Sequence, residues 1–192
     1  MLFRSKGSVL KAVKVLPHGD VVTEPLRLDI GCGKTTPEGW EGVDTIDFGQ
    51  KHVHDVRKGL PFAENSVDEV RSSHFVEHLT GTERIAFFND LWRVMKKDAT
   101  ALIVTPNWSH SCAYGDPTHQ WPPMSQWYPL YLHRDWRAAN APHAPYTCHF
   151  DHVVAGSWDQ SIEGRNPETK SMMMNNYTNA WRDLIVTLTC RK

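Results

Sequence analysis

The six residues from Leu28 to Gly33 constrain the fold of this 192-residue chain more than any other segment. A short apolar stretch leads into Asp29 and then into two glycines, Gly31 and Gly33, which are one residue apart. Glycines at the end of a strand let the backbone approach a ligand more closely than residues with a β-carbon do. An anionic pyrophosphate prefers bare amide N–H groups at such a turn, whereas a carboxylate suits a cationic ligand. The segment therefore predicts a strand and a turn that bind a positively charged nucleoside.

Three further segments predict strands with acidic residues at or near their ends. Residues 41–44 end in Asp44, which is placed to accept hydrogen bonds from ribose hydroxyls. Residues 52–56 contain Asp55, and residues 60–70 predict a turn that leads into a fourth strand. Ligands bind beyond the carboxyl ends of the strands in an open α/β sheet, so we expect these acids at one site.

Residues 26–107 contain, in this order, the motifs D-I-G-C-G, G-W, V-D, D, L-P-F, V-D and E-H-L. With these motifs the segment resembles the class I S-adenosylmethionine (SAM)-dependent methyltransferases, particularly small bacterial and phage-type members. The resemblance implies an α/β fold, a Rossmann-like three-layer sandwich, with SAM as the cofactor. It also implies a role for each matching residue. Asp29, Gly31 and Gly33 form the cofactor turn with the backbone of Cys32, Asp44 binds the ribose, Asp55 and Val56 face the adenine, and Ser73 and His74 line the methionine end.

A general base is expected among the eleven histidines. Residues 115–119 resemble the D-P-x-H element that follows the fifth strand in some small methyltransferases, which makes His119 the first candidate for the catalytic base. His74 and His78 are the next candidates. Glu77 and His78 together are expected to orient the helix that follows them rather than to take part in catalysis.

Cys148, His149 and His152 have side chains of the types that bind zinc. Only these three ligands lie close together in the sequence, and their spacing suits a strand with alternating side chains. We therefore assign no metal ligand from the sequence.

The connections between the first predicted strands are unusually short. Residues 31–40 separate the first two strands, and residues 45–51 separate the next two. A parallel crossover normally needs a dozen or more residues, usually with a helix. We therefore expect shortened early crossovers whose helices are lost or reduced to a turn.

Residues 1–192 are expected to form one domain with two appended parts. Residues 1–25 are a lightly basic lead-in, in which residues 8–16 predict a short helix. Residues 106–148 hold seven of the twelve prolines and are rich in tryptophan and tyrosine. Such a segment is too aromatic for a disordered tail, so it predicts a cap over the substrate site. We expect most of its aromatic side chains to pack the cap onto the body.

A helix is predicted to begin at the capping box of residues 80–83. Its expected core residues at helical spacing are Ile85, Phe88, Trp92 and Met95.

The apolar run 101–105 predicts a strand that is buried on both faces. Residues 150–158 and 184–190 predict the antiparallel strand pair at one edge of the sheet, and residues 172–174 predict a helix that contacts the cap.

These features predict a SAM-dependent methyltransferase that acts on an oxygen or nitrogen nucleophile of a small-molecule, sugar-like or nucleotide acceptor. The net charge of −1 gives no strongly basic surface, so nucleic acid is possible but not favoured. The four scattered cysteines and the lack of an apolar membrane span or signal-peptide pattern predict a cytoplasmic chain with no membrane partner.

Three alternatives remain open. The chain can methylate nucleic acid or protein, although it has no D/N-P-P-Y/F tetrapeptide after a strand and no Pro-Cys nucleophile. It can be a non-catalytic SAM-binding subunit of a partner enzyme. An NAD-dependent enzyme is disfavoured, because Thr36 stands where a third glycine is required and Asp44 comes earlier than the ribose-binding acid about 20 residues on.

Overall fold

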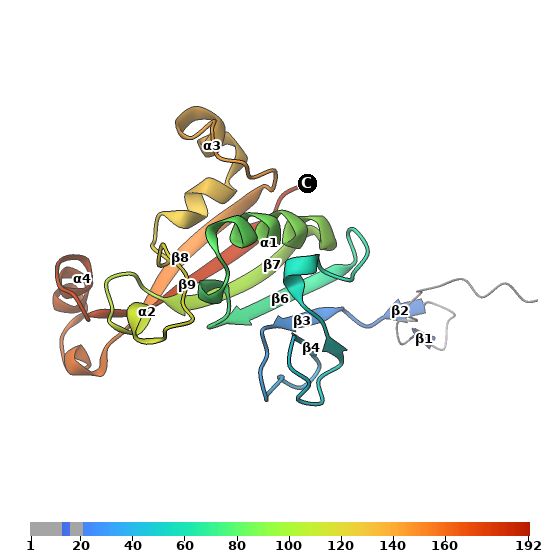
Figure 1. Ribbon diagram of the computed structural model, residues 1–192, viewed down its shortest axis with the longest axis horizontal. Helices are drawn as coiled ribbons and strands as arrows, with labels where there is room; N and C mark the ends of the chain where they lie inside the picture. Colours follow the sequence, from blue (N-terminus) through green and yellow to red (C-terminus); the bar gives the residue numbers. More distant parts are fainter. Residues whose placement is uncertain (1–12, 16–20) are drawn as a thin grey trace, which may run out of the picture.

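The computed structural model describes residues 13–15 and 21–192, and its centre is a seven-stranded sheet (Figure 1). The strand order is β5-β4-β3-β6-β7-β9-β8. The first five strands in this order are parallel, and β9 pairs antiparallel with both β7 and β8. The predicted α/β class and the antiparallel pair near the C-terminus are confirmed. The strands are β3 (Arg27–Ile30), β4 (Glu41–Asp44), β5 (His52–Val53), β6 (Val67–Ser73), β7 (Met95–Pro106), β8 (Phe150–Trp158) and β9 (Trp181–Cys190).

The early crossovers are as short as the sequence predicts. No helix lies between β3 and β4 or between β4 and β5, and a single turn, η1 (Val56–Lys58), follows β5. Backbone hydrogen bonds replace the helices, since Gly31 N donates to Val43 O at 2.8 Å and His54 N donates to Asp44 O at 2.8 Å. The loops at this end of the sheet are therefore fixed by the strands themselves.

Helix α1 (Gly81–Val94) covers one face of the sheet, across β6 and β7 (Figure 1). The predicted capping box at its start is present, with Thr80 and Glu83 bonding each other's backbone. Of the core residues expected from the sequence, Phe88 and Met95 are buried, but Met95 is the first residue of β7. The other two, Ile85 and Trp92, are only partly buried, because the helix turns a different stripe toward the sheet. That stripe consists of Arg84, Phe87, Phe88, Leu91 and Val94.

The opposite face of the sheet is open in the part of the chain that the structure describes. Leu102 in β7 is 37% exposed, whereas its neighbour Ile103 is fully buried. Leu102 pairs with Thr187 of β9, which pairs with the 69% exposed Val153 of β8. The prediction that residues 101–105 are buried on both faces is wrong, because the short crossovers bring no helix to the second face.

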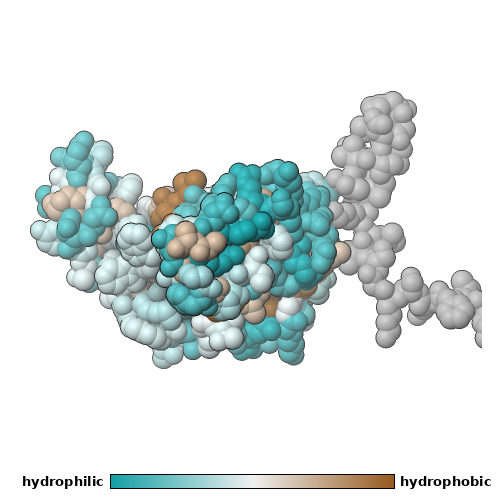
Figure 2. All heavy atoms as spheres, turned by 90° about the horizontal axis from the view of Figure 1, so that it is seen from above, coloured by the Kyte–Doolittle hydropathy of each residue, from teal (hydrophilic) through white to brown (hydrophobic). Residues whose placement is uncertain are grey.

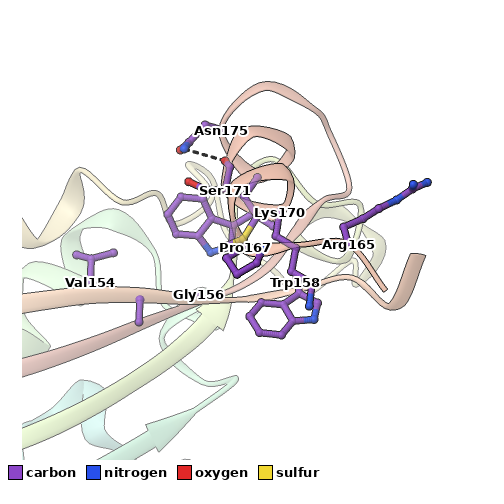
Figure 3. A pocket seen from close by; sticks show the side chains of 11 residues that line it. Val154, Gly156, Trp158, Arg165, Pro167, Lys170, Ser171 and Asn175 are labelled. Carbon is purple, nitrogen blue, oxygen red and sulfur yellow. Dashed lines mark hydrogen bonds between the residues drawn. The ribbon is translucent and has the colours of Figure 1, made fainter. Parts of the chain in front are cut away.

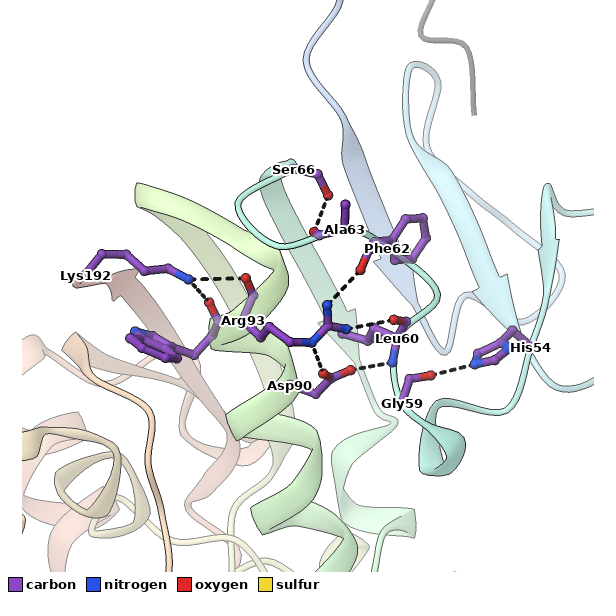
Figure 4. Close-up of polar contacts among 10 residues, drawn as sticks. His54, Gly59, Leu60, Phe62, Ala63, Ser66, Asp90, Arg93 and Lys192 are labelled. Carbon is purple, nitrogen blue, oxygen red and sulfur yellow. Dashed lines mark hydrogen bonds and ion pairs between the residues drawn. The ribbon is translucent and has the colours of Figure 1, made fainter. Parts of the chain in front are cut away.

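A polar network ties the L-P-F turn to helix α1 (Figure 4). The guanidinium of Arg93 donates to Phe62 O at 2.9 Å and to Leu60 O at 3.0 Å. The carboxylate of Asp90 accepts from Arg93 and from the backbone N–H of Leu60. This network fixes the approach of the chain to β6.

Residues 106–148 lie between β7 and β8 and contain three short helices. These are α2 (Cys112–Gly115), η3 (Tyr128–Leu132) and α3 (Arg134–Asn140). Half of the eight tryptophans and tyrosines of this segment are exposed, so the expectation that most of them pack against the body is wrong. The exposed ones are Trp108, Tyr114, Trp121 and Trp127. Seen from above, the surface is mainly hydrophilic, with small separate hydrophobic areas (Figure 2).

Between β8 and β9 the chain forms the turn η4 (Gln160–Ile162) and helix α4 (Pro167–Asn176), which confirms the predicted helix at residues 172–174. Met174 lines a small cavity together with Trp108 and Gln126 of the predicted cap, so the helix and the cap border the same space. A further turn, η2 (Val76–His78), precedes α1.

At the N-terminal end, β1 (Val13–Val15) pairs antiparallel with β2 (Val21–Thr23). The helix predicted for residues 8–16 is wrong at residues 13–15, because β-branched valines favour a strand there. The rest of that segment lies outside the described residues. No helix within the described residues is long and apolar enough to cross a bilayer.

Candidate cofactor and active site

A cavity of about 540 Å³ lies at the carboxyl ends of β3, β4 and β6. This is the edge at which an open α/β sheet binds ligands. Several segments contribute to it: the glycine turn after β3, the end of β4, the chain around η1 and the segment after β6. The lining residues are Gly31, Val43, Asp44, Thr45, Ile46, His54, Asp55, Val56, Arg57, His74, Phe75, His78, Leu79 and Thr118.

Gly31 lines this cavity at the turn after β3. Its φ of 70° lies in the left-handed region that favours glycine. A β-carbon at Gly31 would lie 2.5 Å from the β-carbon of Phe75, so no other residue fits. Gly33 also has a positive φ, of 57°, but open space surrounds the position of its β-carbon. The two glycines thus meet different requirements of the same turn.

Asp44 connects the glycine turn to the cavity. Its Oδ2 atom accepts from Gly33 N at 2.9 Å, and its Oδ1 atom accepts from Ile46 N at 3.0 Å. Each carboxylate oxygen keeps a further acceptor site, so the side chain is able to bind hydroxyl groups in the cavity.

Asp29 is not one of the residues that line the cavity. Its carboxylate is buried and lies 3.3 Å from the guanidinium of Arg71 on β6. Burial raises the pKa of Asp29, and the charge of Arg71 opposes this shift. Cys32 lies in the turn between the glycines without lining the cavity, and burial raises the pKa of its thiol. Neither Asp29 nor Cys32 lines the cavity, and their predicted roles toward a cofactor stay predictions.

Asp55 and Val56 both line the cavity. The carboxylate of Asp55 accepts two hydrogen bonds from the guanidinium of Arg57, at 2.8 and 3.0 Å, and caps η1. Hydrogen bonds from Arg57 lower the pKa of Asp55. Asp55 therefore lines the cavity beside η1 with an ionised carboxylate that Arg57 holds in place.

His74 lines the cavity, whereas Ser73, its neighbour in β6, does not. His74 has a left-handed backbone, with φ 54°. Its Nδ1 atom lies 3.4 Å from Glu77 Oε1, and its Nε2 atom lies 3.9 Å from Asp183 Oδ1. Interaction with Glu77 raises the pKa of His74 despite partial burial. The segment after β6 thus places an imidazole with a raised pKa at the cavity.

His119 lies just behind the cavity lining, against His78. The two rings meet edge to face, with centroids 4.8 Å apart. His78 and Thr118 reach the cavity, and Gln120 N donates to Glu77 O at 2.8 Å. The structure therefore joins the segment after β6 to the start of the predicted cap, and the catalytic role of His119 stays a prediction.

Several lining residues are not among those expected from the sequence. Ile46 is 60% exposed although it follows Asp44 by only two residues, and His54 Nε2 donates to Gly59 O at 2.6 Å. An apolar side chain in the polar loop after a predicted ribose-binding acid is the signal that would have revealed Ile46. Leu79 and Thr118 carry no comparable signal, because long-range packing brings them to the cavity.

A second cavity of about 390 Å³ lies beneath α4, at the β8 side of the sheet (Figure 3). Trp158 and Gly156 of β8 border it, and Lys170 of α4 lies with its Nζ atom 3.9 Å from the centroid of the Trp158 ring. No residue of the glycine turn reaches this cavity.

The comparisons agree with this geometry. Residues 40–103 match the family described as methyltransferase domain. A SAM-dependent methyltransferase from Archaeoglobus fulgidus is 18% identical, with a TM-score of 0.59 and 86% of each chain covered. Geranyl diphosphate C-methyltransferase from Streptomyces coelicolor, crystallised with S-adenosylhomocysteine, is 14% identical, with a TM-score of 0.52, 88% of this chain and 72% of that chain covered. A methyltransferase complex with the Trm112 activator from Haloferax volcanii is 16% identical, with a TM-score of 0.51, 88% of this chain and 83% of that chain covered. No curated protein matches the chain.

The sheet order and the glycine turn define a Rossmann-like α/β protein with a cavity at the carboxyl ends of its strands. Residues 40–103 match a methyltransferase domain, and the chain has the fold of a SAM-dependent methyltransferase.

Proposed function

We propose that this chain transfers a methyl group from SAM to an oxygen or nitrogen nucleophile of a small-molecule, sugar-like or nucleotide acceptor. The observation that carries the proposal is the 540 Å³ cavity, with Asp44 at one end and His74 and His78 at the other. Its volume is in the range of about 300–1,000 Å³ that small-molecule sites occupy. Bound there, SAM supplies a methyl group on a positively charged sulfur.

The residues present fit this group. Gly31 lines the cavity with its backbone, and Asp44 offers oxygen acceptors for ribose hydroxyls. Val43 and the exposed Ile46 offer apolar contacts for a base.

The chain's own contribution to transfer is positioning, which is worth up to about 7–11 kcal/mol in well-ordered systems. The cap segment narrows the acceptor end through Thr118, which favours a small acceptor over a polymer. His119 is the candidate that the sequence offers for removing a proton from the acceptor. Its Nδ1–H group donates to Ala113 O at 3.1 Å, which leaves the lone pair on Nε2.

Calorimetry with SAM and S-adenosylhomocysteine tests the cofactor site. Asp44→Asn is expected to weaken binding at least about 10-fold, because one ribose acceptor becomes a donor and the bond from Gly33 N is disturbed. Asp47→Asn is the matched control, since Asp47 lies in the same loop and caps Gly49 N without lining the cavity. Equal affinity in the wild type and Asp44→Asn would contradict the assignment.

Methyl transfer from labelled SAM to fractionated cell extract tests the acceptor class. We expect label in the small-molecule fraction with the purified chain alone. Label in RNA or protein would contradict the proposed acceptor, and transfer only after addition of a partner protein would indicate a subunit instead of an independent enzyme.

A further inference from the structure

Glu77, His78 and His119 bring three metal-binding side chains together at the acceptor end of the cavity. Each offers one ligand atom, and these atoms all lie within 4.8 Å of one another. Two backbone contacts hold the set together, because Gln120 N and the Arg84 guanidinium both donate to Glu77 O, at 2.8 and 3.2 Å.

The hydrogen bonds of His119 set its tautomer. Its Nδ1 atom faces Ala113 O at 3.1 Å, and a carbonyl only accepts, so Nδ1 carries the hydrogen. The Nε2 atom of His119 is therefore left with a free lone pair.

His78 reaches the same state through a relay. Thr118 Oγ1 donates its single hydrogen to Asp116 Oδ1 at 2.7 Å, and it lies 2.8 Å from His78 Nδ1. The hydroxyl must then accept from His78, so His78 Nδ1 carries a hydrogen and Nε2 holds the lone pair. Partners that hold the second ring nitrogen in this way are typical of histidines that bind metals.

Glu77 supplies an independent observation. The residue is only 4% exposed, yet neither carboxylate oxygen has a hydrogen bond. His74 Nδ1 lies 3.4 Å from Oε1, so a protonated His74 pairs with that oxygen, whereas Oε2 has neither a hydrogen bond nor an ion-pair partner among the described residues. A buried carboxylate is costly unless it is paired, hydrogen-bonded or bound to a metal.

We propose that Glu77, His78 and His119 bind a divalent transition-metal ion, with Zn²⁺ the best match to two imidazoles and one carboxylate. Three protein ligands leave a coordination position open, as in sites where zinc binds a substrate oxygen. Two ligand atoms that each lie about 2.1 Å from one zinc ion are at most about 4.2 Å apart, a spacing that the 4.8 Å bound on these three atoms allows.

The ion would give the acceptor site a preference for oxygen nucleophiles, and this part of the inference rests on the proposed function. It also gives the Nε2 lone pair of His119 a different use from the proton removal expected from the sequence. The acceptor hydroxyl would bind at the open coordination position, where the ion makes it more acidic.

A second cluster, formed by His133, Asp135 and His149, does not suit a metal ion. Backbone N–H groups of Trp136 and Arg134 donate to the Nδ1 atoms of His133 and His149, at 3.3 and 3.1 Å. The neutral rings therefore carry their hydrogens on Nε2, and no free lone pair remains. The zinc ligands weighed from the sequence, Cys148, His149 and His152, are not brought together as a set.

Titration of the chelator-treated full chain with ZnCl₂ by calorimetry tests the site. We expect one ion per chain, and at least about 100-fold weaker binding in His119→Ala and Glu77→Gln, each of which loses a ligand. His149→Ala is the control and is expected to bind as the wild type does. Thr118→Val is expected to weaken binding about 10-fold through His78, and Thr118→Ser to restore it.

Circular dichroism of each variant checks that it is folded. Co²⁺ added to the wild type provides a measurement that needs no variant, because its visible absorption reports a site of nitrogen and oxygen ligands. No binding by the wild type, unchanged binding in His119→Ala, or loss of binding in His149→Ala would overturn the proposal. Zinc binding without SAM binding would leave the metal site intact and contradict the proposed function instead.

Discussion

Left-handed backbone occurs at two residues that line the 540 Å³ cavity, Gly31 and His74, and at the neighbouring Gly33. Gly31 and Gly33 adopt it in the turn after β3, and His74 adopts it directly after β6. For a residue with a side chain this conformation costs about 1–2 kcal/mol. At His74 the conformation coincides with a ring that lies against the cavity and faces Glu77. Local strain at such a position is typical of functional sites.

Gly31→Ala is expected to destabilise the chain more than Gly33→Ala. Both substitutions force alanine into a left-handed conformation, at about 1–2 kcal/mol. Only Gly31→Ala also drives a β-carbon to 2.5 Å from Phe75, which adds about 1–3 kcal/mol of overpacking. Urea unfolding of both variants measures the difference. Equal unfolding midpoints would show that Phe75 yields and that the close contact has no cost.

Residues that line the cavity were predictable from the sequence where they come at or shortly after the end of a predicted strand. Gly31, Asp44 and Asp55 follow directly from strand ends, and the structure lines the cavity with them. Asp29 and Ser73 do not line it, because the direction of a strand side chain depends on register. Asp29 pairs with Arg71, a residue 42 positions away, and no local pattern reveals that partner.

Among the helices and turns, the buried Arg84 joins α1 to the chain before it, at Val76 and Glu77, and to the start of the predicted cap. Its guanidinium donates to the carbonyls of Val76 and Gln120, at 3.2 and 2.9 Å, and also to those of Glu77 and Pro122. Burial lowers the pKa of Arg84 from its ordinary value. One side chain of α1 thus holds two other segments, residues 76–77 and residues 120–122, through their backbone carbonyls.

Arg84→Lys is expected to cost about 2–4 kcal/mol and to loosen the start of the cap. Lysine has three donors on one atom and is unable to reach four carbonyls in a planar arrangement, so buried acceptors stay unsatisfied. Hydrogen exchange should show lost protection at residues 118–122.

Arg93→Lys serves as the matched control for this measurement. Arg93 binds Phe62 O and Leu60 O on the other side of α1, so its replacement should expose residues 60–66 and leave the cap unchanged (Figure 4). Loss of cap protection in both variants would mean that α1 unfolds as a whole and that Arg84 has no specific role.

Across the described part of the molecule, the sheet has one covered face and one open face. Ile103→Ala is expected to cost about 2–5 kcal/mol, because it leaves a cavity beneath α1. Leu102→Ala is expected to cost about 1 kcal/mol or less, because its side chain is on the open face. Chemical unfolding of the two variants, which change adjacent residues of β7, measures this asymmetry. A similar cost for both would indicate that another surface covers Leu102 in solution.

The sequence predicts the sheet more completely than the layers around it. Strand ends, short crossovers and the final antiparallel pair all follow from local composition and from loop lengths. The open face of the sheet and the exposed tryptophans do not follow from local composition. An apolar run such as residues 101–105 is compatible with a strand that is covered on one face and with a strand that is covered on both. The cluster of Glu77, His78 and His119 is likewise not predictable from local sequence, because tertiary contacts of Arg84 and of the cap bring these residues together.

Under the proposed function, the short crossovers have a consequence for how the spent cofactor leaves the cavity. The nucleoside end of the cavity is bordered by a loop in which Ile46 and Phe48 are 60% and 40% exposed, and no helix roofs it. The opposite end is tied down through Arg84. We expect the nucleoside to exchange sideways through the rim while the acceptor end stays assembled, so that product release follows no obligatory order.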